Sequence, residues 1–316
     1  MELLQKELLS LKVANSRFFP ALGLALMLLG VSLAGRAASI EEQMYRQDVT
    51  DWRQEKETSL KQDNGWLTLA GRFVMKTGEN RFGTAADNDI VFPANSGPGH
   101  MGSFRVEPGK VTLKLTEGMV ALAGDQAFTE RPMGTSTEKR DWVSFGHLAM
   151  HVIERDGAYV LRLADNESEV RKQFPGRVWY AVKPDYRVVG RFVAYQPAKK
   201  IPIINVLGEA AEEASPGYVE FQLDGHSFSL DAIDEDDELF FIFRDGTSGQ
   251  TTYPPGRFLV AKKASDSKVV LDFNKAYNPP CAFSEFTTCP LPPRQNQLKV
   301  RVEAGERDYK KKLAVQ

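Results

Sequence analysis

Two short segments in the last quarter of the chain gather polar residues that could bind a ligand. One segment is a turn and its exit, and the other is a strand end and its loop. The first carries Asp245, Thr247, Ser248, Tyr253 and Arg257, and the second carries Asp272, Asn274, Tyr277 and Asn278. An arginine can grip an oxyanion at two points, and backbone N–H groups of the Gly246–Gly249 turn add donors. If the two strands pair, the set converges at one rim of a sheet and predicts a site for a small polar or anionic ligand.

The same residues admit other roles. Asp245 and Asn274 could simply close turns through their side chains, and Arg257 could form a structural ion pair with Asp272. A hydrolase is a further alternative, because a carboxylate pair can act as acid and base. The pairs suited to that chemistry are Asp245 with Asp272, and Asp272 with Glu306. The sequence therefore does not decide whether the protein is an enzyme. A structural or interaction protein of the cell envelope is the third class of function that it allows.

The histidines do not predict a metal site. His147 and His151 have the spacing of two ligands on one helical turn, but their run leads into the Asp156-Gly157 turn and is typical of a strand. On a strand they would lie roughly 13 Å apart, so we expect one half-buried and one surface histidine. The sequence also carries no glycine-rich phosphate loop. We therefore expect no metal and no cofactor.

Two cysteines, Cys281 and Cys289, lie eight positions apart in the proline-rich segment Asn278–Pro293. In an oxidising compartment this spacing favours a disulfide that closes a short loop. A zinc site would need two further ligands, and a catalytic Cys281 would need a base from far back in the chain, because no histidine follows His226. We predict the disulfide, with a reactive Cys281 as the alternative in a reducing compartment.

The first 38 residues have the pattern of a targeting segment. Lys12 and Arg17 precede the uncharged run Phe18–Gly35, and small residues follow before Ser39. This pattern is typical of a secretory signal peptide, and the length of the run also reaches the lower limit for a membrane anchor. We expect export to the periplasm or to the outer face of the inner membrane. Contact with the membrane is expected only through an uncleaved N-terminal segment.

The charge balance argues against a nucleic-acid partner. The 316 residues include 40 Lys and Arg against 42 Asp and Glu, so no basic field is available to hold phosphates along a strand. Hydrophobic residues make up 42% of the chain, which is enough to bury a core and to exclude a disordered polymer. The partner that we expect is a small molecule of unknown identity.

The pattern of the remaining chain predicts an all-β fold. After an amphipathic helix at residues 40–62, short apolar or alternating runs separated by turn residues extend from Trp66 to Val302. They predict a mostly antiparallel fold with sandwich or barrel-like layers and one N-terminal helix. The Asp224-Gly225 pair is typical of a hairpin turn. The expected domains are an N-terminal β subdomain at 63–130, a C-terminal β domain at 141–308 and a charged tail at 309–316.

Several motifs between Trp52 and Glu306 occur in an order that resembles a known family. They are Gly65-Trp66-Leu67, Thr247-Ser248-Gly249, Gly256-Arg257, Asp272-Phe273-Asn274, Tyr277-Asn278-Pro279-Pro280-Cys281, Cys289-Pro290 and Ala304-Gly305-Glu306. In these motifs the chain is similar to the bacterial and archaeal family called domain of unknown function 1684. That family has no assigned activity, so the resemblance implies membership and supplies no catalytic roles.

Overall fold

The computed structural model describes residues 20–310 apart from residues 156, 264 and 265, with side chains from Ser39 onward. Helix α1 spans Pro20–Leu60 and so begins earlier than the expected residues 40–62. The chain divides after Asp51 into a first unit with most of α1 and a second unit from Trp52 onward. Residues 1–19 of the expected signal peptide or anchor lie outside the described residues. Among the helices of the described part, none is long and apolar enough to cross a membrane.

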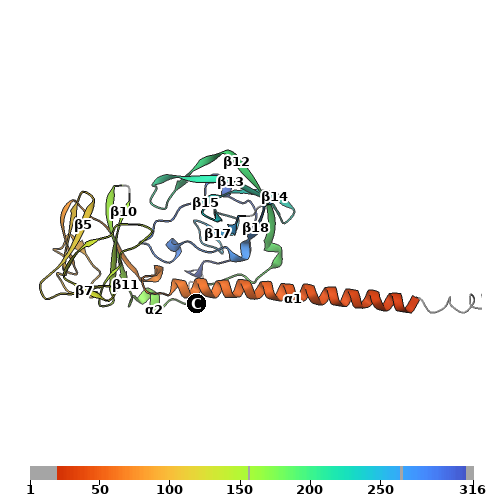
Figure 1. Ribbon diagram of the computed structural model, residues 1–316, viewed down its shortest axis with the longest axis horizontal. Helices are drawn as coiled ribbons and strands as arrows, with labels where there is room; N and C mark the ends of the chain where they lie inside the picture. The colour runs from red at the N-terminus through yellow and green to blue at the C-terminus, as the bar shows by residue number, and fades with distance from the viewer. Residues whose placement is uncertain (1–19, 156, 264–265, 311–316) are drawn as a thin grey trace, which may run out of the picture. The chain divides into compact units, whose positions relative to one another are not determined.

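Residues 69–165 of the second unit form two sheets that share one core (Figure 1). The six-stranded sheet, in the order β1-β11-β10-β9-β6-β7, consists of Leu69–Val74, Ala158–Asp165, Leu148–Arg155, Val143–Phe145, Ala121–Ala123 and Gln126–Phe128. The five-stranded sheet, in the order β3-β2-β4-β5-β8, consists of Ile90–Val91, Gly78–Gly83, Gly102–Glu107, Lys110–Leu115 and Glu130–Met133. Phe82 and Phe104 from one sheet and Leu148 and Leu161 from the other are fully buried in this core.

The expected domain boundary at residues 130–141 falls within this pair of sheets. Strands β9, β10 and β11 follow that point in the chain, yet β11 pairs with β1 and β9 pairs with β6. Alternation of apolar residues identifies each strand but does not say which distant strand it will pair with. The sandwich therefore extends to Asp165.

Residues 187–272 form two further sheets (Figure 1). The four-stranded sheet, in the order β14-β13-β12-β18, consists of His226–Asp231, Ala210–Leu223, Arg187–Ile204 and Lys268–Asp272. The three-stranded sheet, in the order β15-β16-β17, consists of Ile233–Glu235, Glu238–Phe243 and Arg257–Lys262. Asp224 and Gly225 have φ angles of 51° and 75° and close the β13–β14 hairpin, as the sequence predicts.

The all-β class with one long N-terminal helix is confirmed. All strand pairs are antiparallel except β2 with β3. The other helical pieces are short turns: α2 at Glu169–Lys172, η1 at Trp66–Thr68, η2 at Pro184–Tyr186, η3 at Phe273–Lys275, η4 at Pro280–Ala282 and η5 at Arg294–Asn296. After β18 the described chain continues without a named strand, and Leu298, Val302 and Ala304 pack into the core of this half. This last segment reaches the residues that the sequence analysis singled out.

Candidate functional site

The Asp245–Arg257 pair lies in the interior of the C-terminal half. Arg257 begins β17 and lies opposite Phe243, two residues before Asp245, so strand pairing brings the two side chains together. The Arg257 Nη2 donates to the Asp245 Oδ2 at 2.7 Å, and neither side chain has exposed surface. Arg257 also donates to the carbonyls of Val302, at 3.0 Å, and of Ala304. This geometry is that of an ion pair that fixes the C-terminal segment to the sheet.

The Asp245 carboxylate also closes the turn after β16. Its Oδ1 accepts hydrogen bonds from the backbone N and from the Oγ1 of Thr247, each at 2.6 Å. The Ser248 Oγ accepts a hydrogen bond from the backbone N of Asp245 at 3.2 Å. Tyr253, further along the same segment, is half-buried beside the cluster around Leu60. Asp245, Thr247 and Ser248 therefore match the turn-closing alternative of the sequence analysis.

The second polar segment does not join the first in the expected way. β18 pairs with β12, which places Arg187 opposite Asp272, and within the described chain the two polar segments pair only through one antiparallel bridge between Phe258 and Tyr277. The Asp272 Oδ1 accepts a hydrogen bond from the backbone N of Asn274 at 3.1 Å. The Asn274 amide bonds the backbone N and O of Lys183 at 3.0 and 2.8 Å. The structural partner of Arg257 is thus Asp245 and not Asp272, because strand pairing over long sequence distances decides which groups meet.

Glu306 is a buried carboxylate with two donors. Its Oε2 accepts hydrogen bonds from the Arg177 Nη1 at 2.6 Å and from the backbone N of Asn278 at 2.8 Å. Burial raises the pKa of Glu306 to about 7, and the nearby Arg177 acts in the opposite direction. Glu306 has no exposed surface. Its Oε1 has no partner among the described residues, so the carboxylate is only partly satisfied by its surroundings.

Gly305 holds Glu306 in this position. Its φ is +76°, and a Cβ there would lie 2.6 Å from the carbonyl oxygen of Ala276 and 2.7 Å from that of Phe273. The turn also lets Gly305 accept a hydrogen bond from the backbone N of Tyr180 at 2.9 Å. A side chain at this position would collide with backbone, so the Ala304-Gly305-Glu306 motif has a steric explanation.

The remaining motif residues pack against each other. Tyr277 lies edge-on to Phe258, with ring centroids 5.8 Å apart, and its ring also lies 4.6 Å from the Lys56 Nζ. Asp245, Asp272 and Glu306 line none of four cavities found on the described residues, so the carboxylate pairs considered for a hydrolase do not face those four.

Cys281 and Cys289 form the predicted disulfide. Their Cα atoms are 6.0 Å apart, and the bond closes the short loop within the proline-rich segment. Such a bond fits an oxidising compartment. The disulfide accounts for both cysteines of the chain and removes the alternative of a free thiol.

Buried polar atoms without a partner occur around Arg257 and Glu306, and also in a second region that contains His151. This second region is a cavity of about 470 Å³, which we call the arginine pocket, and Arg162 and His151 lie at its base. The complete lining is Ser59, Gln62, Asp63, Asn64, Gly65, Trp66, Leu69, Thr137, Arg140, Trp142, His151, Ile153, Arg155 and Arg162. The pocket thus lies between the six-stranded sheet, the end of α1 and the loop before β9.

Three basic side chains form a row across the strands at this base. Arg162 on β11 lies opposite Arg72 on β1 and opposite His151 on β10. Like charges directly opposite each other destabilise a sheet. Arg162 is only 8% exposed, and within the described residues no carboxylate or other acceptor bonds to its guanidinium. Burial, with Arg72 and Arg140 nearby, lowers the pKa of Arg162 to about 10.

His151 is also buried without a hydrogen-bond partner. It is 4% exposed, and neither its Nδ1 nor its Nε2 has a partner among the described residues. Its ring stacks on Trp142, with centroids 4.2 Å apart. Burial, together with Arg140 and Arg162, lowers the pKa of His151 to about 4, although Asp141 acts in the opposite direction. At neutral pH the ring is therefore uncharged and can donate one N–H into the pocket.

The acidic groups near this pocket are bonded to other arginines. Asp63, the one carboxylate of the lining, pairs with Arg171 at 2.6 Å. Asp141, the neighbour of His151, accepts hydrogen bonds from the Arg131 Nη2 at 2.9 and 3.1 Å. The pocket therefore keeps an excess of positive charge that these carboxylates do not neutralise.

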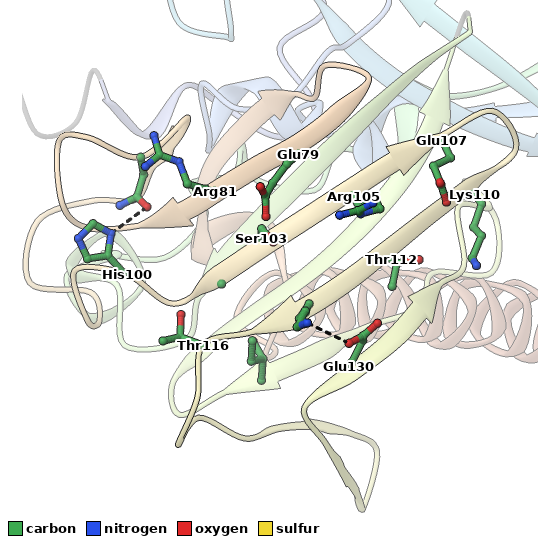
Figure 2. A pocket seen from close by; sticks show the side chains of 14 residues that line it. Glu79, Arg81, His100, Ser103, Arg105, Glu107, Lys110, Thr112, Thr116 and Glu130 are labelled. Carbon is green, nitrogen blue, oxygen red and sulfur yellow. Dashed lines mark hydrogen bonds and ion pairs between the residues drawn. The ribbon is translucent and has the colours of Figure 1, made fainter.

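Another cavity, of about 690 Å³ on the outer face of the five-stranded sheet, has a different character. Figure 2 shows its side chains on the face of the sheet, with charges of both signs side by side. Lys114 lies 3.7 Å from Glu130, and Arg81 bonds the nearby Asp89 at 3.3 Å. These side chains are exposed and face water. We interpret this face as a solvated sheet surface.

The arginine pocket was not predicted from the sequence. One signal was available, because Arg162 interrupts the apolar run Tyr159–Leu163, where a buried charge needs a reason. Of His147 and His151, one was expected to be half-buried and the other exposed, but His151 is almost completely buried. Its nearness to Arg72 and Arg140 depends on the fold, and no local spacing reveals it.

Comparison with known proteins supports the family resemblance in the C-terminal half. The model of the family described as protein of unknown function (DUF1684) matches residues 172–307. The chain belongs to this family. The solution NMR structure of an uncharacterized protein of Haloarcula marismortui is similar to the chain at 35% sequence identity, over 43% of this chain and 78% of that one, with a TM-score of 0.37. No curated protein matches the chain. The DUF1684 match includes the Asp245–Arg257 pair and Glu306, whereas the arginine pocket lies before residue 172.

Proposed function

We propose that this DUF1684 protein binds a small anionic ligand in the arginine pocket. The observation that carries the proposal is Arg162, which is 92% buried, lies in a row with Arg72 and His151, and has no acceptor among the described residues. The guanidinium nitrogens of Arg162 are not fully enclosed, so they reach the pocket, while burial of the residue disfavours the charge. A bound anion would stabilise the charged guanidinium, so the electrostatics of the pocket favour the binding of an anion.

The size and walls of the pocket support a small molecule. Its volume of about 470 Å³ falls in the usual range for small-ligand sites. Trp66, Leu69 and Trp142 supply apolar surface, and Arg140 lies over the Trp66 ring with its Cζ 5.7 Å from the centroid. Polar and charged residues make up most of the lining, and together with this apolar surface they can orient a ligand that carries both an anion and an apolar part.

Calorimetric titration tests this function. We expect at least one of phosphate, phenyl phosphate, phenyl sulfate and benzoate to bind the native protein at low ionic strength. The variant Arg162→Gln should weaken that binding by about tenfold or more, because it removes a two-point charged grip. The matched control is Arg105→Gln, which makes the same change at an exposed position on the other sheet. Equal losses in both variants, or no binding of any anion to the native protein, would contradict the proposal.

We also propose that the protein is exported. Support comes from the basic residues and apolar run at the N-terminus and from the Cys281–Cys289 disulfide. Alkaline phosphatase fused after Ser39 should be active, because that enzyme needs an oxidising compartment. A well-expressed but inactive fusion would refute export and leave anion binding as a separate question.

A further inference from the structure

We infer that the ligand of the arginine pocket is a phosphomonoester carried on a sugar or aromatic ring. This inference rests on the proposed function and deepens it. It draws on three features of the pocket: the excess of positive charge, the number of donors at its base, and the two tryptophans in its walls.

The charge of the pocket favours a dianion over a monoanion. Arg140 and Arg162 line it without an acceptor in the described chain, and the one lining carboxylate, Asp63, is bonded to Arg171. A carboxylate or a sulfate ester carries one negative charge, so it would leave one of these two guanidinium charges unbalanced. A phosphomonoester carries between one and a half and two negative charges near neutral pH.

The donors at the base match three terminal oxygens better than two. Arg162 offers a planar fork with no acceptor among the described residues, and the uncharged His151 ring offers one N–H. Arg140 adds a second guanidinium from the loop before β9, also without a hydrogen-bond acceptor in the described chain. A carboxylate has two oxygens in one plane and can engage one fork fully. A phosphomonoester presents three oxygens in a pyramid and can engage donors from several directions.

The remaining space calls for more than a free oxyanion. A cavity of about 470 Å³ is far larger than inorganic phosphate needs, and Trp66 and Trp142 lie in its walls. Indole faces contact the flat faces of sugars and aromatic rings and add affinity without requiring a fixed set of hydrogen bonds. A ring attached to the phosphate would therefore occupy space beside these indoles that the phosphate leaves empty.

The test compares ligands that differ in one property at a time. Phenyl phosphate, phenyl sulfate, glucose 6-phosphate and inorganic phosphate are titrated calorimetrically into the full-length protein at constant ionic strength and pH 7.5. Phenyl phosphate and phenyl sulfate have nearly the same shape but differ in charge. We expect phenyl phosphate or glucose 6-phosphate to bind at least about tenfold more tightly than phenyl sulfate and inorganic phosphate. Tighter binding of phenyl phosphate would identify the ring as aromatic, and tighter binding of glucose 6-phosphate would identify it as a sugar.

Variants of Arg162 distinguish the contribution of its planar guanidinium geometry from that of its positive charge. Arg162→Lys keeps the charge but loses the planar fork, so it should weaken the ring-bearing phosphate by about tenfold, with Arg105→Lys as the control. Equal affinity for phenyl phosphate and phenyl sulfate would overturn the phosphomonoester inference and leave anion binding intact. If inorganic phosphate bound as tightly as the ring-bearing compounds, the inference that the ligand carries a ring would be overturned. Failure of every anion to bind would refute the proposed function together with this inference.

Discussion

Replacing Arg162 by methionine should make the ligand-free protein more stable while it abolishes anion binding. Methionine retains much of the length of the side chain but removes the buried charge between Arg72 and His151. Removal of the fully buried Arg257 should do the opposite, because Arg257 is bonded to Asp245 and to three backbone carbonyls. The two variants make the same chemical change in two different electrostatic surroundings.

The size of the effect follows from the burial of the guanidinium. Its surroundings lower the pKa of Arg162 from 12.5 to about 10, and each pKa unit corresponds to about 1.4 kcal/mol. The charged form therefore costs about 3 kcal/mol relative to water. Replacing Arg162 by methionine removes this cost, but it also removes some packing contacts of the longer arginine side chain. We therefore expect Arg162→Met to increase the free energy of unfolding by about 1 to 3 kcal/mol. Arg257→Met should lower it by about 3 to 5 kcal/mol, because Asp245 would stay buried without its partner.

Urea unfolding in a phosphate-free, low-salt buffer measures both values, and a second series with phenyl phosphate measures linkage. The native protein should gain stability as the ligand is added, whereas Arg162→Met should gain none. A loss of stability in Arg162→Met comparable to that in Arg257→Met would refute the reasoning, since it would mean that Arg162 stabilises the fold without a ligand. An unchanged ligand-dependent gain in Arg162→Met would refute the placement of the site.

Three further outcomes are expected. Because the pKa of His151 is about 4 when folded and about 6.5 when unfolded, the unfolded chain takes up the proton first as the pH falls. Stability should therefore decline between about pH 6.5 and 4 by up to about 3 kcal/mol, and urea midpoints of His151→Gln should show a flatter pH dependence. Gly305→Ala should lower stability by more than about 2 kcal/mol in thermal melts, whereas Gly124→Ala, also at positive φ but facing open space, should cost about 1 kcal/mol. Cys281→Ser should lower the free energy of unfolding by about 2 to 3 kcal/mol, and denatured, unreduced native protein should show no alkylation of Cys281 or Cys289. Two labelled thiols would contradict the last prediction.

The sequence carried the information for the local features of the fold. Alternation of apolar residues predicts the strands, the Asp224-Gly225 pair predicts its hairpin, and the spacing of Cys281 and Cys289 predicts the disulfide. Each of these features depends on residues that lie close together along the chain. The all-β class follows from them without any knowledge of how the strands are arranged.

The candidate site depends on contacts between distant residues, so the sequence could not supply it. A turn aspartate such as Asp245 has the same residue type whether it closes its turn or faces a ligand, and only its contact with Arg257 distinguishes the two. The pairing of β18 with β12 likewise decides where Asp272 lies. Arg162 meets Arg72 only because the last strand of the sandwich returns to pair with the first.

The buried ion pair and the arginine pocket lie in different stretches of the chain. This separation affects whether a function found for one DUF1684 protein can be assigned to another. The family model matches residues 172–307, which include Asp245, Arg257 and Glu306, all of them interior residues that hold the scaffold together. The pocket comes from residues 59–162, which that match does not reach. Two relatives could therefore agree throughout the recognised region and still select different ligands. Relatives should first be compared at the positions of Arg140, His151 and Arg162. A ligand found for one relative should be assigned only to others that carry the same residues there.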